Sequence, residues 1–199
     1  NVCHQDWRGT HDGVTKPING GWHDAGDLSE GSHRTAMATY AMLRVYDQLR
    51  QRSLKPELQA RVLEEARWGL NWLLKTRFGK GYRITWVLGR FYTDNRLGTA
   101  DDMLVPAEHS AMENFLFAAV AAHAAQSIGS AESLRAAMED FQATLDARAD
   151  WSRATRDEAA FGALAATELF RATKRPAYAA EAARFAKLLL GCQQQSFPA

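Results

Sequence analysis

Two carboxylates stand three positions apart in a glycine-rich turn near the start of the chain, at Asp24 and Asp27. The flanking glycines allow backbone conformations with positive φ and the close approach of a bulky ligand. If the turn is helical, side chains at i and i+3 point the same way, so the two carboxylates could hold one water molecule between them. One would act as a general base and the other would orient the water, as hydrolysis of a polymer requires. The alternative is an ordinary turn in which Asp27 or Ser29 caps the next helix.

Aromatic residues close to the carboxylates in sequence, and in a long irregular segment from 79 to 105, could bind sugar rings. Trp22 and His23 directly precede the first carboxylate, and Trp86 and Tyr92 lie among polar neighbours in the irregular segment. An aromatic face packs on the apolar C–H face of a pyranose, so we expect these residues to contact substrate. Core packing is the alternative for each of them.

Other aromatic and titratable residues favour structural roles. Trp68 and Trp72 lie on a predicted helix and are expected in the core. His109 and Glu113 are four positions apart, and we interpret them as a pair on one helix that faces solvent or lines a barrel. Their spacing is not that of the H-E-x-x-H zinc motif.

Two groups of residues could hold metal ions. Cys3 and His4 offer the thiolate and imidazole that zinc prefers, with His11 or a residue upstream of Asn1 completing the site. Ordinary burial of this single Cys-His pair is the alternative. Oxygen ligands for calcium are offered by three aspartates, Asp94, Asp101 and Asp102. They lack the D-x-D-x-D-G spacing of a dedicated calcium loop, and the hydrolysis itself requires no cofactor.

Amphipathic helices account for most of the remaining sequence, and they come in pairs. They are predicted from 32 to 52, from 56 to 77, from 106 to 129, from 130 to about 145, from 155 to about 169 and from 176 to 191. Proline openings and glycine ends support these limits. Three helical hairpins predict an all-α fold, and the long irregular segment favours an α/α toroid over a uniform solenoid.

The composition is that of an ordinary globular domain. The chain has 199 residues, 24% of them charged, and a net charge of +1, so nothing attracts it to nucleic acid or to an anionic membrane. No apolar run approaches the roughly 20 residues that span a bilayer, and no signal sequence is visible. The two cysteines, Cys3 and Cys192, give no disulfide framework. Serine hydrolases and nucleotide enzymes are disfavoured because G-x-S-x-G, P-loop and G-x-G-x-x-G motifs are absent from the sequence.

The run Gly20-Gly21-Trp22-His23-Asp24-Ala25-Gly26-Asp27 resembles the catalytic-base signature of the family 9 glycoside hydrolases, which are inverting cellulases with an (α/α)6 barrel. Residues 3–6, 92–102 and 158–193 resemble the branch of that family with an N-terminal immunoglobulin-like domain. Some members of this branch hold a structural zinc by two Cys-His pairs, of which this chain has one.

This resemblance implies that Asp27 is the general base and Asp24 the second carboxylate that holds the water. It implies cleavage of a β-1,4-glucan such as cellulose or its oligosaccharides, in a secreted or periplasmic enzyme. An exo-acting β-glucosaminidase of the same family and a non-catalytic carbohydrate-binding scaffold are the alternatives.

The chain departs from the family pattern in one respect. The family's general acid is a glutamate near the end of a longer catalytic domain, and no stretch here resembles that motif. Six helices are half of a twelve-helix barrel, so we expect residues 1–199 to be the N-terminal half of one catalytic domain, with the other half as its partner. Half a barrel would expose an apolar edge.

Overall fold

The computed structural model describes residues 4–89 and 92–192, and six helices carry most of this part of the chain. They are α1 (Ser32–Gln51), α2 (Pro56–Lys75), α3 (Ala111–Ile128), α4 (Ala131–Asp146), α5 (Arg156–Thr173) and α6 (Pro176–Gly191). Prolines open α2 and α6, and a capping box at Thr155 and Glu158 opens α5. The expected all-α class is confirmed, although α3 begins five residues later than predicted.

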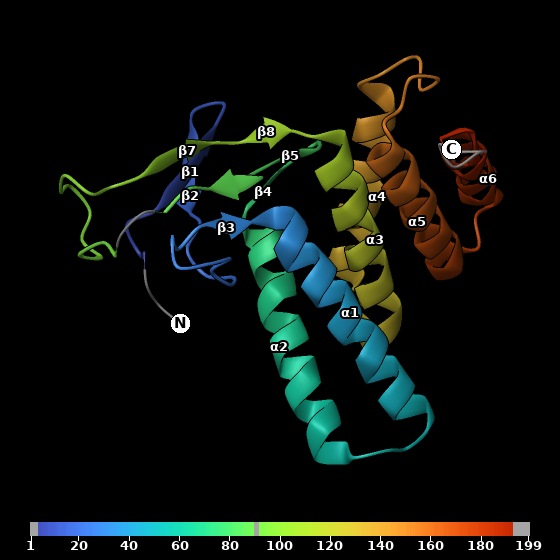
Figure 1. Ribbon diagram of the computed structural model, residues 1–199, viewed down its shortest axis with the longest axis horizontal. Coiled ribbons are helices and arrows are strands. Elements are labelled where there is room, and N and C mark those ends of the chain that lie inside the picture. Colours follow the sequence, from blue (N-terminus) through green and yellow to red (C-terminus); the bar gives the residue numbers. More distant parts are fainter. Residues whose placement is uncertain (1–3, 90–91, 193–199) are drawn as a thin grey trace, which may run out of the picture.

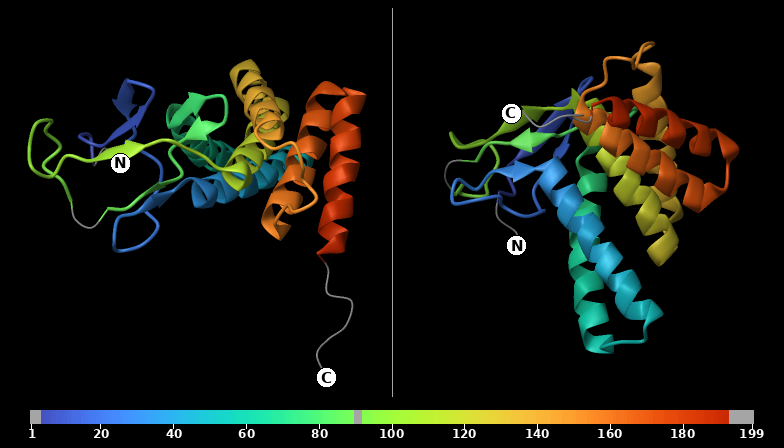
Figure 2. Two further views of the ribbon diagram at one scale, coloured as in Figure 1. Left: turned by 90° about the horizontal axis from the view of Figure 1, so that it is seen from above. Right: turned by 45° about the vertical axis from the view of Figure 1, so that its right-hand side comes forward.

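The helices pack as three hairpins, α1–α2, α3–α4 and α5–α6 (Figure 1). Within each hairpin the first helix is the inner one: α3 packs on both α1 and α5, whereas α2, α4 and α6 lie mainly against their own partners (Figure 2). This is the inner and outer layering of an α/α toroid. In the described residues the layers form an open arc and not a closed barrel, which fits half a toroid.

Helix α3 lies at the centre because it is apolar on all sides. Residues 115–122 are all fully or almost fully buried, and their alanines allow α1 and α5 to approach closely. The ring of Phe115 lies 5.4 Å from that of Phe141, 5.3 Å from that of Trp151 and 5.0 Å from that of Phe185. One aromatic cluster therefore joins α3 to α4 and α6.

Eight short strands gather at one end of the helices (Figure 1). They are β1 (Arg8–His11), β2 (Val14–Pro17), β3 (Glu30–Gly31), β4 (Arg77–Gly79), β5 (Tyr82–Arg83), β6 (Trp86–Val87), β7 (Leu104–Pro106) and β8 (Glu108–His109). They form three small sheets in the orders β2-β1-β7, β3-β6 and β4-β5-β8. Strands of two to four residues are too short to show an alternating pattern, so the sequence does not predict them.

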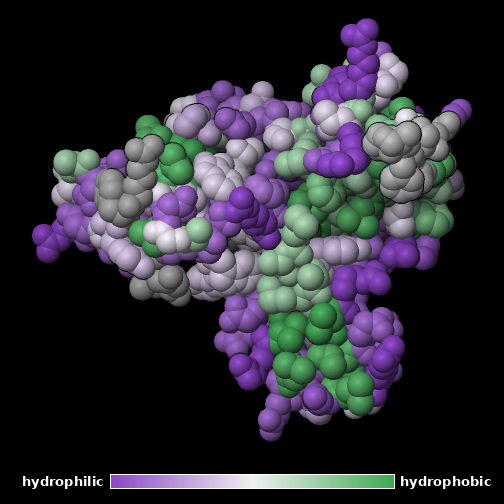
Figure 3. Space-filling view, viewed as in Figure 1, coloured by the Kyte–Doolittle hydropathy of each residue, from purple (hydrophilic) through white to green (hydrophobic). Residues whose placement is uncertain are grey.

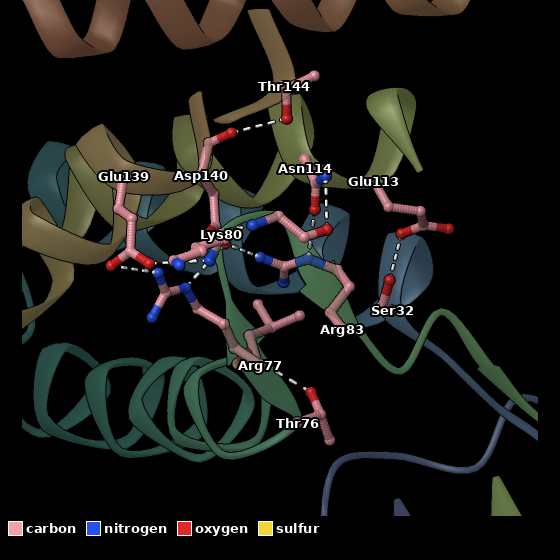
Figure 4. Close-up of polar contacts among 12 residues, drawn as sticks. Ser32, Thr76, Arg77, Lys80, Arg83, Glu113, Asn114, Glu139, Asp140 and Thr144 are labelled. Carbon is pink, nitrogen blue, oxygen red and sulfur yellow. Dashed lines mark hydrogen bonds and ion pairs between the residues drawn. The ribbon is translucent and has the colours of Figure 1, made fainter. Parts of the chain in front are cut away.

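Buried polar contacts fix the β4–β5 hairpin against α3 and α4 (Figure 4). Arg83 is fully buried, and its guanidinium lies 2.5 Å from Asp140 of α4 and donates to Asn114 of α3 at 2.9 Å. Arg77 also donates to Asp140, at 2.8 Å, and the Gly81 N–H donates to the same carboxylate at 3.1 Å. Asp140 thus neutralises two arginines and ties the strand end of the molecule to the helices.

The strand end has a small core of its own, made by Trp7, Ile18, Ile84 and Val87, all of them fully buried.

Figure 3 shows apolar surface over the α1–α2 hairpin, where Val45, Leu54 and Leu58 are exposed. Among the described residues, no helix is both long and apolar enough to cross a membrane.

Candidate functional site

The two carboxylates lie in a closed turn between the strand end and α1. The Asp24 N–H donates to the Ser29 carbonyl at 2.6 Å, the Leu28 N–H to the Ala25 carbonyl at 3.0 Å, and the Ser29 N–H to Oδ1 of Asp27 at 3.1 Å. Leu28 has a φ of 60°, a left-handed conformation that is uncommon for a side chain of its size. The turn is therefore fixed by its own hydrogen bonds, and it is not helical.

The glycines before the turn are required by the close approach of a helix. Gly21 has a φ of 74°, and a Cβ atom there would lie 2.9 Å from the ring of Trp72 on α2. The expected positive φ is thus present at Gly20 and Gly21, whereas the left-handed residue inside the turn is Leu28 and not Gly26.

Neither turn residue caps the following helix. The N-cap of α1 is Gly31, which gives no side-chain hydrogen bond, so the expectation that Asp27 or Ser29 caps this helix is wrong. Asp27 is exposed, and in the described part of the chain no cation lies within ion-pair distance of it. Its carboxylate remains available to a ligand.

Asp24 differs from Asp27 because it has a cationic partner. Its carboxylate forms an ion pair with Arg34 in the first turn of α1, and the Asp24 side chain is 19% exposed. The Arg34 guanidinium also lies 5.0 Å from the ring centre of Trp86, a cation–π contact. Trp86 in turn packs against Gly31, where a Cβ would lie 2.5 Å from its ring. Arg34 therefore contacts both Asp24 and Trp86, one of the rings expected to bind sugar.

A second set of contacts also holds Trp86. His33 stacks on this ring, with centres 5.9 Å apart and an angle of 19° between planes. Its Nδ1 lies 3.2 Å from Oε1 of Glu113, whose other oxygen accepts from Ser32 (Figure 4). Burial raises the pKa of Glu113, and the contacts with Ser32 and His33 oppose this. Glu113 therefore fixes His33, and it does not pair with His109, which lies on β8 and not on the helix; that expectation was wrong.

Trp22 lies beside a hollow of about 500 Å³ that opens next to the turn. Its ring packs on Gly69 of α2, and residues from both segments line the hollow. Trp68 was expected in the core, but it is 36% exposed, lines this hollow and donates from Nε1 to the Gly21 carbonyl at 2.8 Å. Trp72 is 2% exposed, which confirms its core position.

His23 and Tyr92 form an aromatic group with His4. The Tyr92 ring lies 5.9 Å from that of His4, nearly parallel, and 6.5 Å from that of His23. Tyr92 is 71% exposed, so its face is open to a ligand. The four residues expected to contact sugar thus all lie around the carboxylate turn, in separate positions.

The expected zinc ligands were Cys3 and His4. Cys3 lies outside the described residues, and His11 lies apart, stacked on Tyr82 at 4.0 Å. Ligand atoms of His4, His23 and Glu30 lie within 4.8 Å of one another. Imidazole and carboxylate are zinc ligands whose donor atoms in a tetrahedral site are roughly 3.3–3.6 Å apart, so small side-chain movements would make this donor set fit the ion.

Several site residues were missed from the sequence. Arg34, His33 and Glu30 follow the signature within seven residues of Asp27, and Trp68 lies opposite it on α2. One signal was readable: an arginine in the first turn of a helix opposes the helix dipole, which favours acidic residues there. Such an arginine needs an anion nearby, and Asp24 is that anion.

Comparisons with known proteins give the family and the fold. The sequence model of Glycosyl hydrolase family 9 matches residues 2–196. An endoglucanase from the termite Nasutitermes takasagoensis has a similar structure, with a TM-score of 0.65 and 17% identity over 91% of this chain and 47% of that one. For the GH9 protein of Bacteroides ovatus the TM-score is 0.63 and the identity 20%, over 87% of this chain and 38% of that one. For the cellulase Cel9M of C. cellulolyticum the TM-score is 0.60 and the identity 18%, over 86% of this chain and 45% of that one.

At these identities the structural likeness shows the fold alone, and the chain spans less than half the length of each of these proteins. A search of curated proteins found no match. The family assignment rests on the sequence model, which covers almost every residue including the carboxylate turn, and the half-toroid of paired helices agrees with it. The chain belongs to glycosyl hydrolase family 9.

Proposed function

We propose that this chain carries the water-activating half of a glycoside hydrolase that cleaves β-1,4-linked glucan with inversion. The observation that supports it best is the difference between the two carboxylates of the turn. Asp24 is paired with Arg34, whereas Asp27 is exposed and accepts only the Ser29 N–H among the contacts described. A carboxylate held by a guanidinium is a weak proton acceptor, and an unpaired one is a better base. Asp27 is therefore the general base, and Asp24 orients the water.

These two residues cannot supply the acid as well. In an inverting enzyme the acid and the base stand roughly 6.5–9.5 Å apart on opposite faces of the sugar, so that water fits beside the anomeric carbon. Asp24 and Asp27 belong to the same short turn, closed by the hydrogen bond from Asp24 to Ser29. Both serve the water on one face, and the leaving oxygen is protonated from elsewhere.

The substrate class follows from the aromatic residues around the turn. Trp22, Trp68, Trp86 and Tyr92 offer partly or largely exposed rings, which pack on the C–H faces of pyranoses. Several neighbours of similar fold are endoglucanases or cellulases, and one, the endoglucanase CelQ of Clostridium thermocellum, is complexed with cellotriose. A cello-oligosaccharide chain is the substrate that combines these two observations. Because its natural form is an insoluble wall polymer, we place the enzyme outside the cytoplasm.

Product stereochemistry tests this proposal. The protein as encoded by its gene is incubated with cellopentaose, and the anomeric protons of fresh products are followed by NMR. Inversion of a β-link gives the α-anomer first, which then mutarotates. Initial β-anomer would overturn the mechanism, binding without turnover would indicate a non-catalytic scaffold, and turnover of chito-oligosaccharides alone would indicate a glucosaminidase.

We also propose a structural zinc held by Cys3 and His4, with His23 and Glu30 as further ligands, because the ligand atoms of His4, His23 and Glu30 lie within 4.8 Å of one another. Bound there, zinc would supply cross-linking and no step of the hydrolysis. His23 and Glu30 stand immediately before and shortly after the carboxylate turn, so the ion would fix both ends of the turn to the N-terminal segment.

A further inference from the structure

The hollow of about 500 Å³ beside Trp22 lies against the outer helix of the first hairpin. It is lined by residues 21–23, just before the carboxylate turn, and by one face of α2. Neither Asp24 nor Asp27 lines it, and Asp24 pairs instead with Arg34 on the inner helix α1. The proposed hydrolysis therefore leaves this hollow, here called the Trp68 hollow, without a role.

The α2 residues of the Trp68 hollow point away from the helical core. Glu64, Arg67, Trp68 and Asn71 are spaced by three and four positions, so they share one face of the helix, and all four are exposed. Most buried residues of α2 lie on the opposite face, and they are Ala66, Gly69, Leu70 and Leu73. The hollow is therefore open to a ligand from outside the toroid.

Trp68 gives this hollow a fixed aromatic surface. Its Nε1 donates to the Gly21 carbonyl at 2.8 Å, which satisfies the polar atom of the indole and holds the ring in place. The side chain is nevertheless 36% exposed, and the half-buried Trp22 lines the same hollow. Fixed apolar rings of this kind pack on the C–H faces of pyranoses and lose little rotamer freedom on binding.

The polar side chains around the two rings are free to bind a ligand. Among the described residues, the side chains of Glu64, Glu65, Arg67 and Asn71 form no hydrogen bond and no ion pair with other protein groups. They offer donors from the guanidinium and the amide, and acceptors from the carboxylates and the amide, as sugar hydroxyls require. Because charges of both signs line the hollow, the set suits a neutral, hydroxyl-rich ligand.

A neighbouring hollow extends this surface along α2. It has a volume of about 190 Å³, reaches Asn19 and Lys75, and shares Trp68 and Asn71 with the first hollow. From Glu64 to Lys75 the helix rises about 16 Å at 1.5 Å per residue, which is longer than one pyranose ring. The shape thus favours a chain of sugars over a single sugar.

A third hollow on α2 shows that size alone does not make such a surface. It has a volume of about 490 Å³ at the start of the helix, and its lining of Lys55, Pro56, Glu57, Leu58 and Arg61 contains no aromatic ring. Leu58 is 37% exposed, close to the 36% of Trp68. This residue is therefore a matched control on the same helix.

We propose that the Trp68 hollow binds a β-1,4-glucan chain at a second site, separate from the carboxylate turn. The inference rests on the proposed function, because that function names the polymer. Residues 21–23 line the hollow and lead directly into Asp24, so a chain bound on α2 lies next to the turn. Bound there, the polymer stays close to the carboxylates between one cleavage and the next.

Fluorine NMR of the protein as encoded by its gene, labelled with 5-fluorotryptophan, tests the proposal. Asp27→Asn is used throughout so that cellopentaose stays intact, and each resonance is assigned by its loss in the corresponding Trp→Phe variant. The Trp68 and Trp22 resonances are expected to shift as cellopentaose is added, and that of Trp151, which is 6% exposed in the helical core, is not. A Trp68 resonance that does not shift would overturn the proposal.

Polar variants separate direct binding from an effect transmitted through the turn. Arg67→Ala and Asn71→Ala are each expected to weaken binding about fivefold when it is read from Trp68, as for one lost hydrogen bond, and to leave binding read from Trp86 unchanged. Leu58→Ala should change neither value. Equal dissociation constants at Trp68 and Trp86 that neither polar variant alters would show that Trp68 only reports a ligand bound elsewhere.

Substitutions of Trp68 separate a sugar-binding ring from a structural one. Trp68→Ala should weaken binding read from Trp22 about tenfold, the effect of truncating an aromatic hot spot. Trp68→Phe loses the hydrogen bond to Gly21 but keeps an aromatic face, so it should retain most of the affinity. If the phenylalanine variant binds as weakly as the alanine variant, Trp68 serves only to hold Gly21, and its role as a sugar-binding ring is refuted.

The outcome for this site and the outcome for the proposed function can be told apart. A parent protein that hydrolyses cellopentaose while the Trp68 resonance of Asp27→Asn stays fixed would overturn the second site alone. A Trp68 resonance that shifts in the expected manner, in a protein whose parent form has no turnover, would support this site and overturn the proposed hydrolysis.

Discussion

Replacing Asp27 by asparagine should remove most turnover while leaving the fold unchanged. The amide keeps the size of the carboxylate, and its oxygen can still accept the Ser29 N–H that Asp27 accepts at 3.1 Å. What it loses is the ability to take a proton from water. Because no described cation pairs with Asp27, the change breaks no salt bridge.

The expected effects on rate and on stability differ by several kcal/mol. Removing a general base lowers kcat by about 10²–10⁴, which corresponds to roughly 2.7–5.5 kcal/mol in activation free energy. The free energy of unfolding should change by no more than about 0.5 kcal/mol, as for other surface substitutions that keep their contacts. Asp24→Asn should lower kcat less, because an amide oxygen can still hold the water. It should cost at most about 1 kcal/mol of stability through its half-exposed partner Arg34.

The assay combines initial rates on cellopentaose with a thermal melt of each variant. Sodium azide provides a further test in Asp27→Ala, because azide is a nucleophile that needs no base: it forms the bond to the anomeric carbon as the glycosidic bond breaks, and gives an α-glycosyl azide. The control is Asp12→Asn, at an exposed residue of the turn between β1 and β2. An Asp27→Asn enzyme within a few-fold of the parent rate, or one that loses activity only because it unfolds, would refute the assignment.

Three further predictions concern the arginine that pairs with Asp24, a buried glutamate of α5 and the proposed zinc ion. Arg34→Gln should lower kcat about fivefold, which is about 1 kcal/mol in activation free energy, because Asp24 loses its partner. Arg34→Lys should recover part of the lost kcat, and an unchanged kcat in Arg34→Gln would contradict a positioning role. Burial would raise the pKa of Glu168, but contacts with His123 and Tyr40 hold it at about 2, below its ordinary 4.5. This lowered pKa stabilises the fold above pH 4.5 and the gain is lost as pH falls towards 2. Denaturation should therefore give a free energy of unfolding for Glu168→Gln that is lower than the parent's by up to about 3 kcal/mol at pH 7 and equal to it near pH 2. A difference that does not change with pH would contradict this. His4→Ala should remove one zinc per chain by elemental analysis, and a metal-free parent whose melting temperature ignores chelators would exclude the ion.

The helices could be predicted well because their signals are local. Proline at 56 and 176, the Thr155 capping box and glycine at 129 set limits that the structure reproduces within a few residues. The start of α3 was misplaced because Pro106 reads as a helix opening, whereas it ends β7. That strand exists through pairing with β1, about 95 residues earlier, and no local pattern encodes such a partner.

The site was predictable only where its residues are contiguous. The signature gives Trp22, His23, Asp24 and Asp27 together, since one turn holds them all. Trp68 was assigned to the core because it shares a helix with Trp72, yet four positions along an α-helix is about 40° more than a full turn, enough to bring it to the edge of the buried face.

The burial and contacts of the glutamates near the turn decide whether one of them is the general acid. Two glutamates near the turn have raised pKa values, as an acid needs: burial raises the pKa of Glu30 to about 8, and burial raises that of Glu113. Both are buried, at 2% and 6% exposure, and the oxygens of Glu113 are occupied by Ser32 and His33. The Glu30 carboxyl lies 3.6 Å from His23 Nε2, and its burial leaves it no open surface on which a sugar could lie. A raised pKa without access to the leaving oxygen gives no acid catalysis, so these residues position His33 and His23, and the acid of the proposed mechanism is neither of them.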